Sequence, residues 1–288
     1  MVVILTFTEG VDVSLASSKV SLCSVTLDPR IYAFSLDVLY PQILQEGEKM
    51  MRALVFLVSV LLSAASFSDN HLPDNPYLGF YYFSAPNADA VVAAMDKFYA
   101  SDCGKRYPAN VALAEQVFNG GYESTHFFLN AYPSAEAQQA AAEIFRSCSA
   151  ALEFLSELES AGVQPTMEHL SFPLIEEGDS SRDFAFAKFD VRVEPQNQTA
   201  YAMAFSKMMM QASKDIALRS YGNNLAVFGN DKFTNSVYIG AESLAQLEAI
   251  QRALFAHPAY AEFSRETADI REGINTTQVL FLKNYPMQ

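Results

Sequence analysis

Two stretches of this chain match each other without a gap when one is shifted by 110 positions. The match centres on two apolar segments, each broken by a tight turn, at Val117–Tyr122 and Val227–Asp231. An Asn-Gly step between apolar runs predicts a β-hairpin, because both residue types tolerate positive φ. The matching pairs farther out are Asn87 with Asn197, Ala90 with Ala200, Ala94 with Ala204, Lys97 with Lys207, Ala131 with Ala241 and Phe145 with Phe255. The sequence therefore predicts a tandem duplication.

Each half is predicted to run β-α-β-β-α-β, from its apolar periodicity and its turn residues. In the first half the elements are a strand at Tyr77–Ser84, a helix capped by Asn87 or Asp89, strands at Val111–Phe118 and Thr125–Tyr132, a helix from Ala135 to about Ser160, and a strand at Thr166–Leu174. In the second half they are Phe184–Val193, Gln198–Lys214, Leu218–Phe228, Ser236–Gly240, Leu244–Ile270 with a kink at Pro258, and Thr276–Leu282.

This order predicts an α+β chain of two tandem ferredoxin-like repeats, at residues 77–175 and 182–286. The polar segment Glu176–Ser181 is expected to link them. Helices on one face of each antiparallel sheet leave the other face apolar and in need of a cover. We therefore expect the two sheets to pack face to face, as a pseudo-dimeric α/β barrel.

The order of elements and the segment Leu254–Phe263 (LFAHPAYAEF) resemble the dimeric α/β-barrel superfamily, which includes antibiotic-biosynthesis monooxygenase-like domains. The resemblance spans Tyr77–Pro286, as two fused copies where most members use two chains. It implies a fold shared by cofactor-free oxygenases, haem enzymes, isomerases and plain binding proteins. A shared fold does not fix a function, and no catalytic motif of the family transfers residue by residue.

Residues 50–65 have the pattern of a secretory signal peptide: a basic start at Arg52, an apolar core, then small residues. We expect translation to begin at Met50 or Met51, and residues 1–49 to be a leader outside the functional protein or a disordered extension. The alternative is a genuine N-terminal extension. The mature protein is expected to be exported, periplasmic or secreted, with no stable membrane insertion after cleavage.

The net charge of −14 argues against nucleic acid and against an anionic membrane surface as partners. The excess of acidic residues is expected to keep an exported protein soluble. Alternatively, it forms an acidic surface that binds cationic ligands. Export leaves Cys103 and Cys148 as candidates for one disulfide between antiparallel helices, although free thiols remain an alternative. No metal-binding motif is present, and the oligomeric state is not predicted.

Strand alternation separates a helix-covered face from a face directed between the sheets. Six residues are predicted on the inner face as a ligand-binding set: Tyr82, His126, His169, Lys188, Asp190 and Arg192. Aromatic walls with a few convergent polar groups are typical of a small-molecule site. Alternatively, Lys188, Asp190 and Arg192 form a solvated face at an open barrel edge or a simple ion-pair ladder, and the two histidines are hydrogen-bonded strand residues rather than ligands.

Three classes of function follow. The first is an envelope protein that binds a small apolar or aromatic molecule between its two sheets. The second is an enzyme, either a cofactor-free oxygenase or a haem protein with an inward histidine as ligand. The third is an interaction domain with a filled interior. The substrate, the catalytic residues and any cofactor stay open at this stage.

Overall fold

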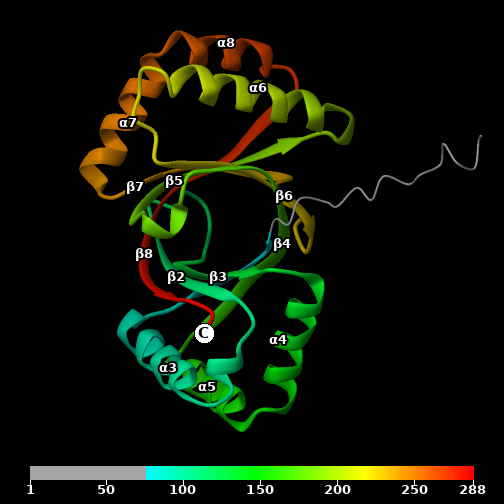
Figure 1. The fold of residues 1–288 in the computed structure, drawn as a ribbon, viewed down its shortest axis with the longest axis vertical. Coiled ribbons are helices and arrows are strands. Elements are labelled where there is room, and N and C mark those ends of the chain that lie inside the picture. The colour runs from blue at the N-terminus through cyan, green and yellow to red at the C-terminus, as the bar shows by residue number, and fades with distance from the viewer. Residues whose placement is uncertain (1–75) are drawn as a thin grey trace, which may run out of the picture. The chain divides into compact units, whose positions relative to one another are not determined.

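The computed structural model describes residues 76–288 (Figure 1). The elements of the first half are β1 (Tyr77–Ser84), α3 (Ala88–Ala100), η1 (Gly104–Arg106), β2 (Asn110–Val117), β3 (His126–Tyr132), α4 (Ala135–Ser147), α5 (Ser149–Ser160) and β4 (Gln164–Glu177). Those of the second half are β5 (Ala185–Val193), α6 (Gln198–Ala212), β6 (Ser220–Phe228), β7 (Asn235–Ala241), α7 (Leu244–Ala256), α8 (Pro258–Glu266) and β8 (Arg271–Tyr285). Two further 3₁₀ turns are η2 (Ser180–Arg182) and η3 (Pro195–Asn197).

The eight strands form one closed antiparallel barrel in the order β1-β3-β2-β8-β5-β7-β6-β4, with β4 paired back to β1. The prediction of two open sheets packed face to face is therefore wrong. The sheets of the two halves join edge to edge, through the pairs β2–β8 and β4–β6. Backbone groups at a sheet edge need partners, and each half's edge strands find them in the other half.

The long strands β4 and β8 close the barrel. β4 pairs with β1 of its own half and with β6 of the other, while β8 pairs with β5 and with β2. Both extend well beyond the predicted strands at Thr166–Leu174 and Thr276–Leu282. The residues added at the C-terminal end of each strand pair with the opposite half, a long-range contact without a local sequence signal. Those added at the N-terminal end pair with β1 or β5 of the same half.

Helices α3, α4 and α5 cover one side of the barrel, and α6, α7 and α8 cover the opposite side (Figure 1). Asn87, Ser134 and Ser243 cap α3, α4 and α7 by accepting a hydrogen bond from the backbone N–H three residues on. Each helix layer packs on its strands as a separate apolar core. A third core fills the barrel interior and contains Leu78, Phe80, Tyr82, Ala114, Phe127, Phe186 and Val279.

The helix predicted from Ala135 to Ser160 is divided at Cys148, whose extended backbone separates α4 from α5. Cys148 forms a disulfide with Cys103, and their Cα atoms lie 6.5 Å apart. The bridge ties the segment after α3 to the junction of α4 and α5.

The predicted leader at residues 1–49 and the predicted signal peptide at residues 50–65 lie outside the described residues. The repeat boundaries and the duplication itself stay predictions, since an order of strands does not establish the origin of a chain. Within residues 76–288, no helix has the length and apolar character that crossing a membrane requires.

Candidate functional site

The barrel interior brings together four of the six predicted ligand-binding residues: Tyr82, His169, Lys188 and Asp190. All four are buried, with at most 5% of their surface exposed. Lys188 and Asp190 form an ion pair, and Asp190 also accepts a hydrogen bond of 3.1 Å from the Tyr122 hydroxyl. The Lys188 ammonium lies 5.7 Å from the centre of the Tyr82 ring. The predicted inward face of these strands is thus a compact polar cluster.

His169 is an uncharged member of this cluster. Its ring stacks on Phe80 at 4.7 Å between centroids, and its Nδ1 lies 3.0 Å from the Ser171 hydroxyl. Burial, and secondarily the charge of Lys188, lowers the pKa of His169 to about 3. Its Nε2 and the Tyr82 hydroxyl have no hydrogen-bond partner within the described residues. Surrounding aromatic side chains pack directly on the cluster, so we regard it as a polar core rather than an open binding site.

The other two predicted residues lie elsewhere. His126 pairs with Phe83 across β1 and β3 and stacks on its ring, and Phe83 belongs to the helix-covered core. Residues directly opposite on paired strands share a face, so His126 lies outside the barrel interior. Arg192 lies at the rim, with 42% of its side chain exposed and an ion pair to Glu272.

The face assignment of β3 failed because both faces of this strand are apolar. Phe127 and Leu129 face the interior, whereas Phe128 and Asn130 face the helices. Alternation reveals a strand's buried face only when the other face is polar. The pairing of β3 with β1 identifies the inward face. Tyr82 faces inward and pairs with Phe127, so Phe127 faces inward as well.

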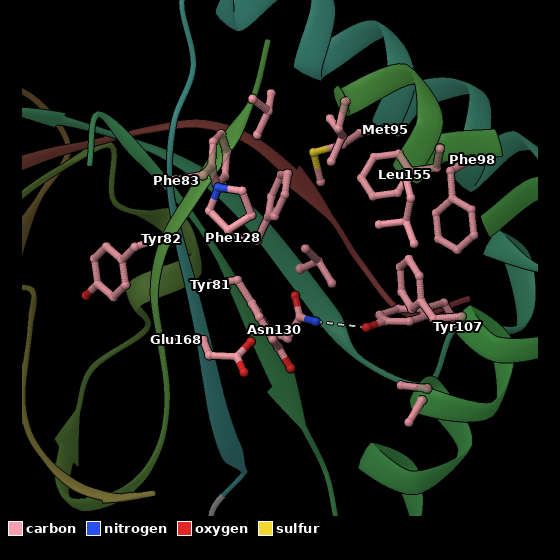
Figure 2. Close-up of a pocket in the computed structure, with 18 of the residues that line it drawn as sticks. Tyr81, Tyr82, Phe83, Met95, Phe98, Tyr107, Phe128, Asn130, Leu155 and Glu168 are labelled. Carbon is pink, nitrogen blue, oxygen red and sulfur yellow. Dashed lines mark hydrogen bonds between the residues drawn. The ribbon is translucent and has the colours of Figure 1, made fainter. Parts of the chain in front are cut away.

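A cavity of about 670 Å³ lies between the helices of the first half and the outer face of β1, β3 and β4 (Figure 2). We call it the first cavity. Its walls are mainly aromatic and aliphatic: Met95, Phe98 and Tyr99 from α3, Phe145 from α4, Phe154, Leu155 and Leu158 from α5, and Tyr81, Phe83 and Phe128 from the strands. This cavity lies outside the barrel interior, between helices and the sheet, and has room for a small molecule.

A hydroxyl–amide cluster forms the polar part of the first cavity's wall: Tyr81, Tyr107, Asn130 and Tyr132. The Asn130 amide donates hydrogen bonds of 2.8 Å to both the Tyr107 and the Tyr132 hydroxyls. The Tyr132 hydroxyl lies 3.2 Å from that of Tyr81. Figure 2 shows Tyr81, Asn130 and Tyr107 on one side of the cavity, with Tyr82 directed away from them.

Burial raises the pKa of Tyr81, Tyr107 and Tyr132 well above the usual value for a phenol. These hydroxyls therefore stay protonated at neutral pH and act as donors or acceptors toward a ligand. Glu168 is the acid in the wall of the first cavity, and its charge contributes to the raised pKa of Tyr81. The wall has no lysine, arginine or histidine among the described residues.

Local backbone geometry and the disulfide position Tyr107 in this cluster. Tyr107 follows η1 directly, and its backbone N–H donates to the carbonyl of Gly104, the first residue of η1. A Cβ at Gly104 would lie 2.1 Å from the Phe98 carbonyl oxygen, so only glycine allows η1 to pack this closely on α3. Cys103 precedes this turn and joins it to Cys148. Tyr107 is not among the predicted site residues, because it lies in a turn between a helix and a strand, where neither helical nor strand periodicity assigns a face.

No known protein-family profile and no curated protein sequence match this chain. Solved structures do. A candidate monooxygenase from Fusobacterium nucleatum has a TM-score of 0.53 and 13% identity, over 73% of this chain and 94% of that one. A candidate monooxygenase from Lactobacillus acidophilus has a TM-score of 0.50 and 10% identity, over 74% and 97%. A haem-binding protein from Thermus thermophilus has a TM-score of 0.45 and 11% identity, over 73% and 92%.

These neighbours are proteins of the dimeric α/β-barrel type, and the likeness shows a common fold. At such low identity it says nothing about the chemistry of this chain, and the third likeness is too weak to support an argument. No group of three or more His, Cys, Asp or Glu residues that could hold a metal ion occurs in the described part of the chain.

Proposed function

We propose that this protein binds a small, largely apolar aromatic molecule that carries a hydroxyl or carbonyl group, and that it does so in the first cavity. The observation that supports this best is the hydroxyl–amide cluster, which lies in an otherwise aromatic wall. Aromatic side chains favour a flat apolar ligand. Protonated phenols and an amide favour one neutral polar group on that ligand, because a buried polar group without a partner costs free energy.

Binding can be measured with a single tryptophan as a reporter, because the chain has none. Leu155 lines the first cavity and is 46% exposed, so Leu155→Trp places an indole at its edge. We expect 2-naphthol to quench this fluorescence with a lower Kd than naphthalene, which lacks the hydroxyl.

In the same background, Asn130→Leu should weaken 2-naphthol binding by roughly 1 kcal/mol, about the net value of one hydrogen bond. Naphthalene binding should change little. The matched control is Tyr77→Phe, which removes a hydroxyl outside the cavity wall. Equal affinity of 2-naphthol for the Asn130→Leu variant and its parent would remove the basis for the proposal.

A second candidate function is an oxygenase that needs no bound cofactor. The fold shared with two candidate monooxygenases and the position of Glu168 beside the cluster favour it. Here Glu168 takes a proton from an activated ring CH₂ group, and the cluster stabilises the negative charge that develops on the ligand's oxygen. With O₂ as oxidant, the ring CH₂ becomes a carbonyl and the second oxygen atom leaves as water. Substrate-dependent oxygen uptake that is abolished in Glu168→Gln would support this candidate.

A haem ligated by histidine does not fit the first cavity. Haem iron takes a His, Cys, Met or Tyr ligand, and the described wall contains no histidine. His169 is enclosed in the barrel interior and does not line the first cavity. We therefore derive no step through haem.

We also propose that the protein is exported. The signal-peptide pattern of residues 50–65 motivates this proposal, and the disulfide between Cys103 and Cys148 agrees with an oxidising compartment. N-terminal sequencing of the protein from its host's extracytoplasmic fraction should give a mature start between about Ser66 and Asp69. Recovery of an uncleaved chain from the cytoplasm alone would contradict it.

A further inference from the structure

A second cavity, of about 440 Å³, lies in the other half of the molecule, between α6, α7 and α8 and the strands they cover. We call it the second cavity. Its apolar wall includes Phe205 and Met208 from α6, Leu254 and Phe255 from α7, and Phe263 from α8. Helices α6–α8 and α3–α5 lie on opposite sides of the barrel (Figure 1), so the two cavities are separate spaces.

The second cavity differs from the first in having a cation in its wall. The Arg271 guanidinium carbon lies 4.7 Å from the centre of the Phe263 ring. Within the described residues Arg271 has no carboxylate partner, although most other arginines there, such as Arg192 and Arg219, pair with one. The acid in the wall, Asp190, is already paired with Lys188 inside the barrel. An arginine that has no carboxylate partner and lies beside an apolar cavity is available to an anion.

A buried hydroxyl lies beside this cation. Tyr201 is fully buried, lines the second cavity, and has no hydrogen bond of good geometry from its hydroxyl within the described residues. Burial raises the pKa of Tyr201 to about 12, and the nearby Arg271 partly opposes the rise. The hydroxyl therefore keeps its proton, and an acceptor in the cavity would satisfy it.

A bulge in β8 adds room next to these two groups. Asp190 pairs with Asn275 and Val191 pairs with Gly273, so Ile274 is an extra residue on β8. Gly273 lines the cavity, and a Cβ built on it would meet no atom within 4 Å. The backbone at the cavity's edge is thus open, close in sequence to Arg271.

We infer that the second cavity is a separate binding site for a small apolar carboxylate, such as a medium-chain fatty acid or an aromatic acid. Arg271 and Tyr201 would hold the carboxylate, and Phe205, Met208 and Leu254 would enclose the apolar part. The first cavity, with Glu168 and no cation in its described wall, would disfavour the same ligand. The chain would then hold two ligands of different chemistry, one in each half.

Single tryptophans distinguish the two cavities. Phe255 lines the second cavity and is 46% exposed, the same exposure as Leu155 in the first. Decanoate should change the fluorescence of the Phe255→Trp protein at concentrations that leave the Leu155→Trp protein unchanged. Decanol, which has the same chain without the charge, should bind the Phe255→Trp protein about tenfold or more weakly.

Two variants in the Phe255→Trp background test the assigned groups. Arg271→Gln should weaken decanoate binding about tenfold or more, and Tyr201→Phe about threefold to tenfold, while decanol binding stays the same. Arg265→Gln is the matched control, since it neutralises an exposed arginine of α8 that lies outside the cavity wall. If Arg271→Gln fails to fold by circular dichroism, Tyr201→Phe decides alone.

Decanoate affinity that is unchanged in the folded variants, or equal affinity for decanol and decanoate, would overturn the inference. A protein that binds decanoate in the second cavity but not 2-naphthol in the first would refute the proposed function and leave this inference standing.

Discussion

Lys188 and Asp190 lie two residues apart on β5 and form an ion pair inside the barrel, where 6% and 0% of their side chains are exposed. Replacing one partner would leave the other charge buried and alone. We expect Asp190→Asn and Lys188→Met each to lower the free energy of unfolding by about 3–5 kcal/mol, and the double variant by less than the sum. Urea unfolding monitored by circular dichroism measures this. The exposed pair Arg146–Glu143 is the control, because its loss should cost at most about 1 kcal/mol.

His169 should make the protein sensitive to acid. The pKa of its folded form is lowered to about 3, whereas an unfolded histidine titrates near pH 6.5. The unfolded chain therefore binds a proton that the folded chain excludes, and stability falls as the pH drops from about 6.5 toward 3. In His169→Phe this contribution disappears, so unfolding free energies measured between pH 6 and pH 4 should fall less steeply, by up to about 1.4 kcal/mol per pH unit. Parallel curves for the variant and its parent would contradict the assignment.

The disulfide between Cys103 and Cys148 closes a loop with a sequence separation of 45 residues. In the chain-entropy model, such a loop stabilises the folded state by about 3–4 kcal/mol. We expect the Cys103→Ser, Cys148→Ser double variant to lose about this much in urea unfolding. Dithiothreitol should destabilise the parent protein by a similar amount and leave the double variant unchanged, which separates the effect of the bridge from that of the substitutions.

Gly104 should not tolerate alanine. The added methyl group would overlap the Phe98 carbonyl and push η1 away from α3, and Tyr107 would move with it. We expect Gly104→Ala to cost about 1–3 kcal/mol of stability and to weaken 2-naphthol binding to the Leu155→Trp reporter protein. Gly121→Ala is the control, because a Cβ there meets no atom within 4 Å. Equal stability of the two variants would show that the contact is readily relieved.

Local features of this fold were accessible from the sequence. Asn87 and Ser134 begin helices where their capping side chains predict it, and β1 spans the predicted Tyr77–Ser84. Barrel closure was not accessible, because the pairing of β8 with β2 joins residues far apart in the chain and depends on edges that only the folded halves present. Alternation placed Lys188 and Asp190 correctly inside the barrel, since their neighbours on β5 are apolar. It misplaced His126, because β3 is buried on both faces.

The first cavity was missed for a related reason. Its polar groups come from Tyr81 and Asn130 on strands and from Tyr107 in a turn, and no spacing in the sequence connects them. Each is a single polar residue in an apolar segment, which is also what an ordinary strand or helix end contains. Only the packing of α3, α4 and α5 on the outer face of the sheet makes them converge.

β4 and β8 each pair with a strand of both halves, and this affects how closure of the barrel depends on protein concentration. A barrel built from two separate chains closes by association, so dilution opens it. Here both seams, β2–β8 and β4–β6, join parts of one chain, and closure is a unimolecular step that dilution does not reverse. Because the two halves belong to one chain, they also need not have the same sequence. The residues that line the cavity of one half can change while those of the other half stay the same.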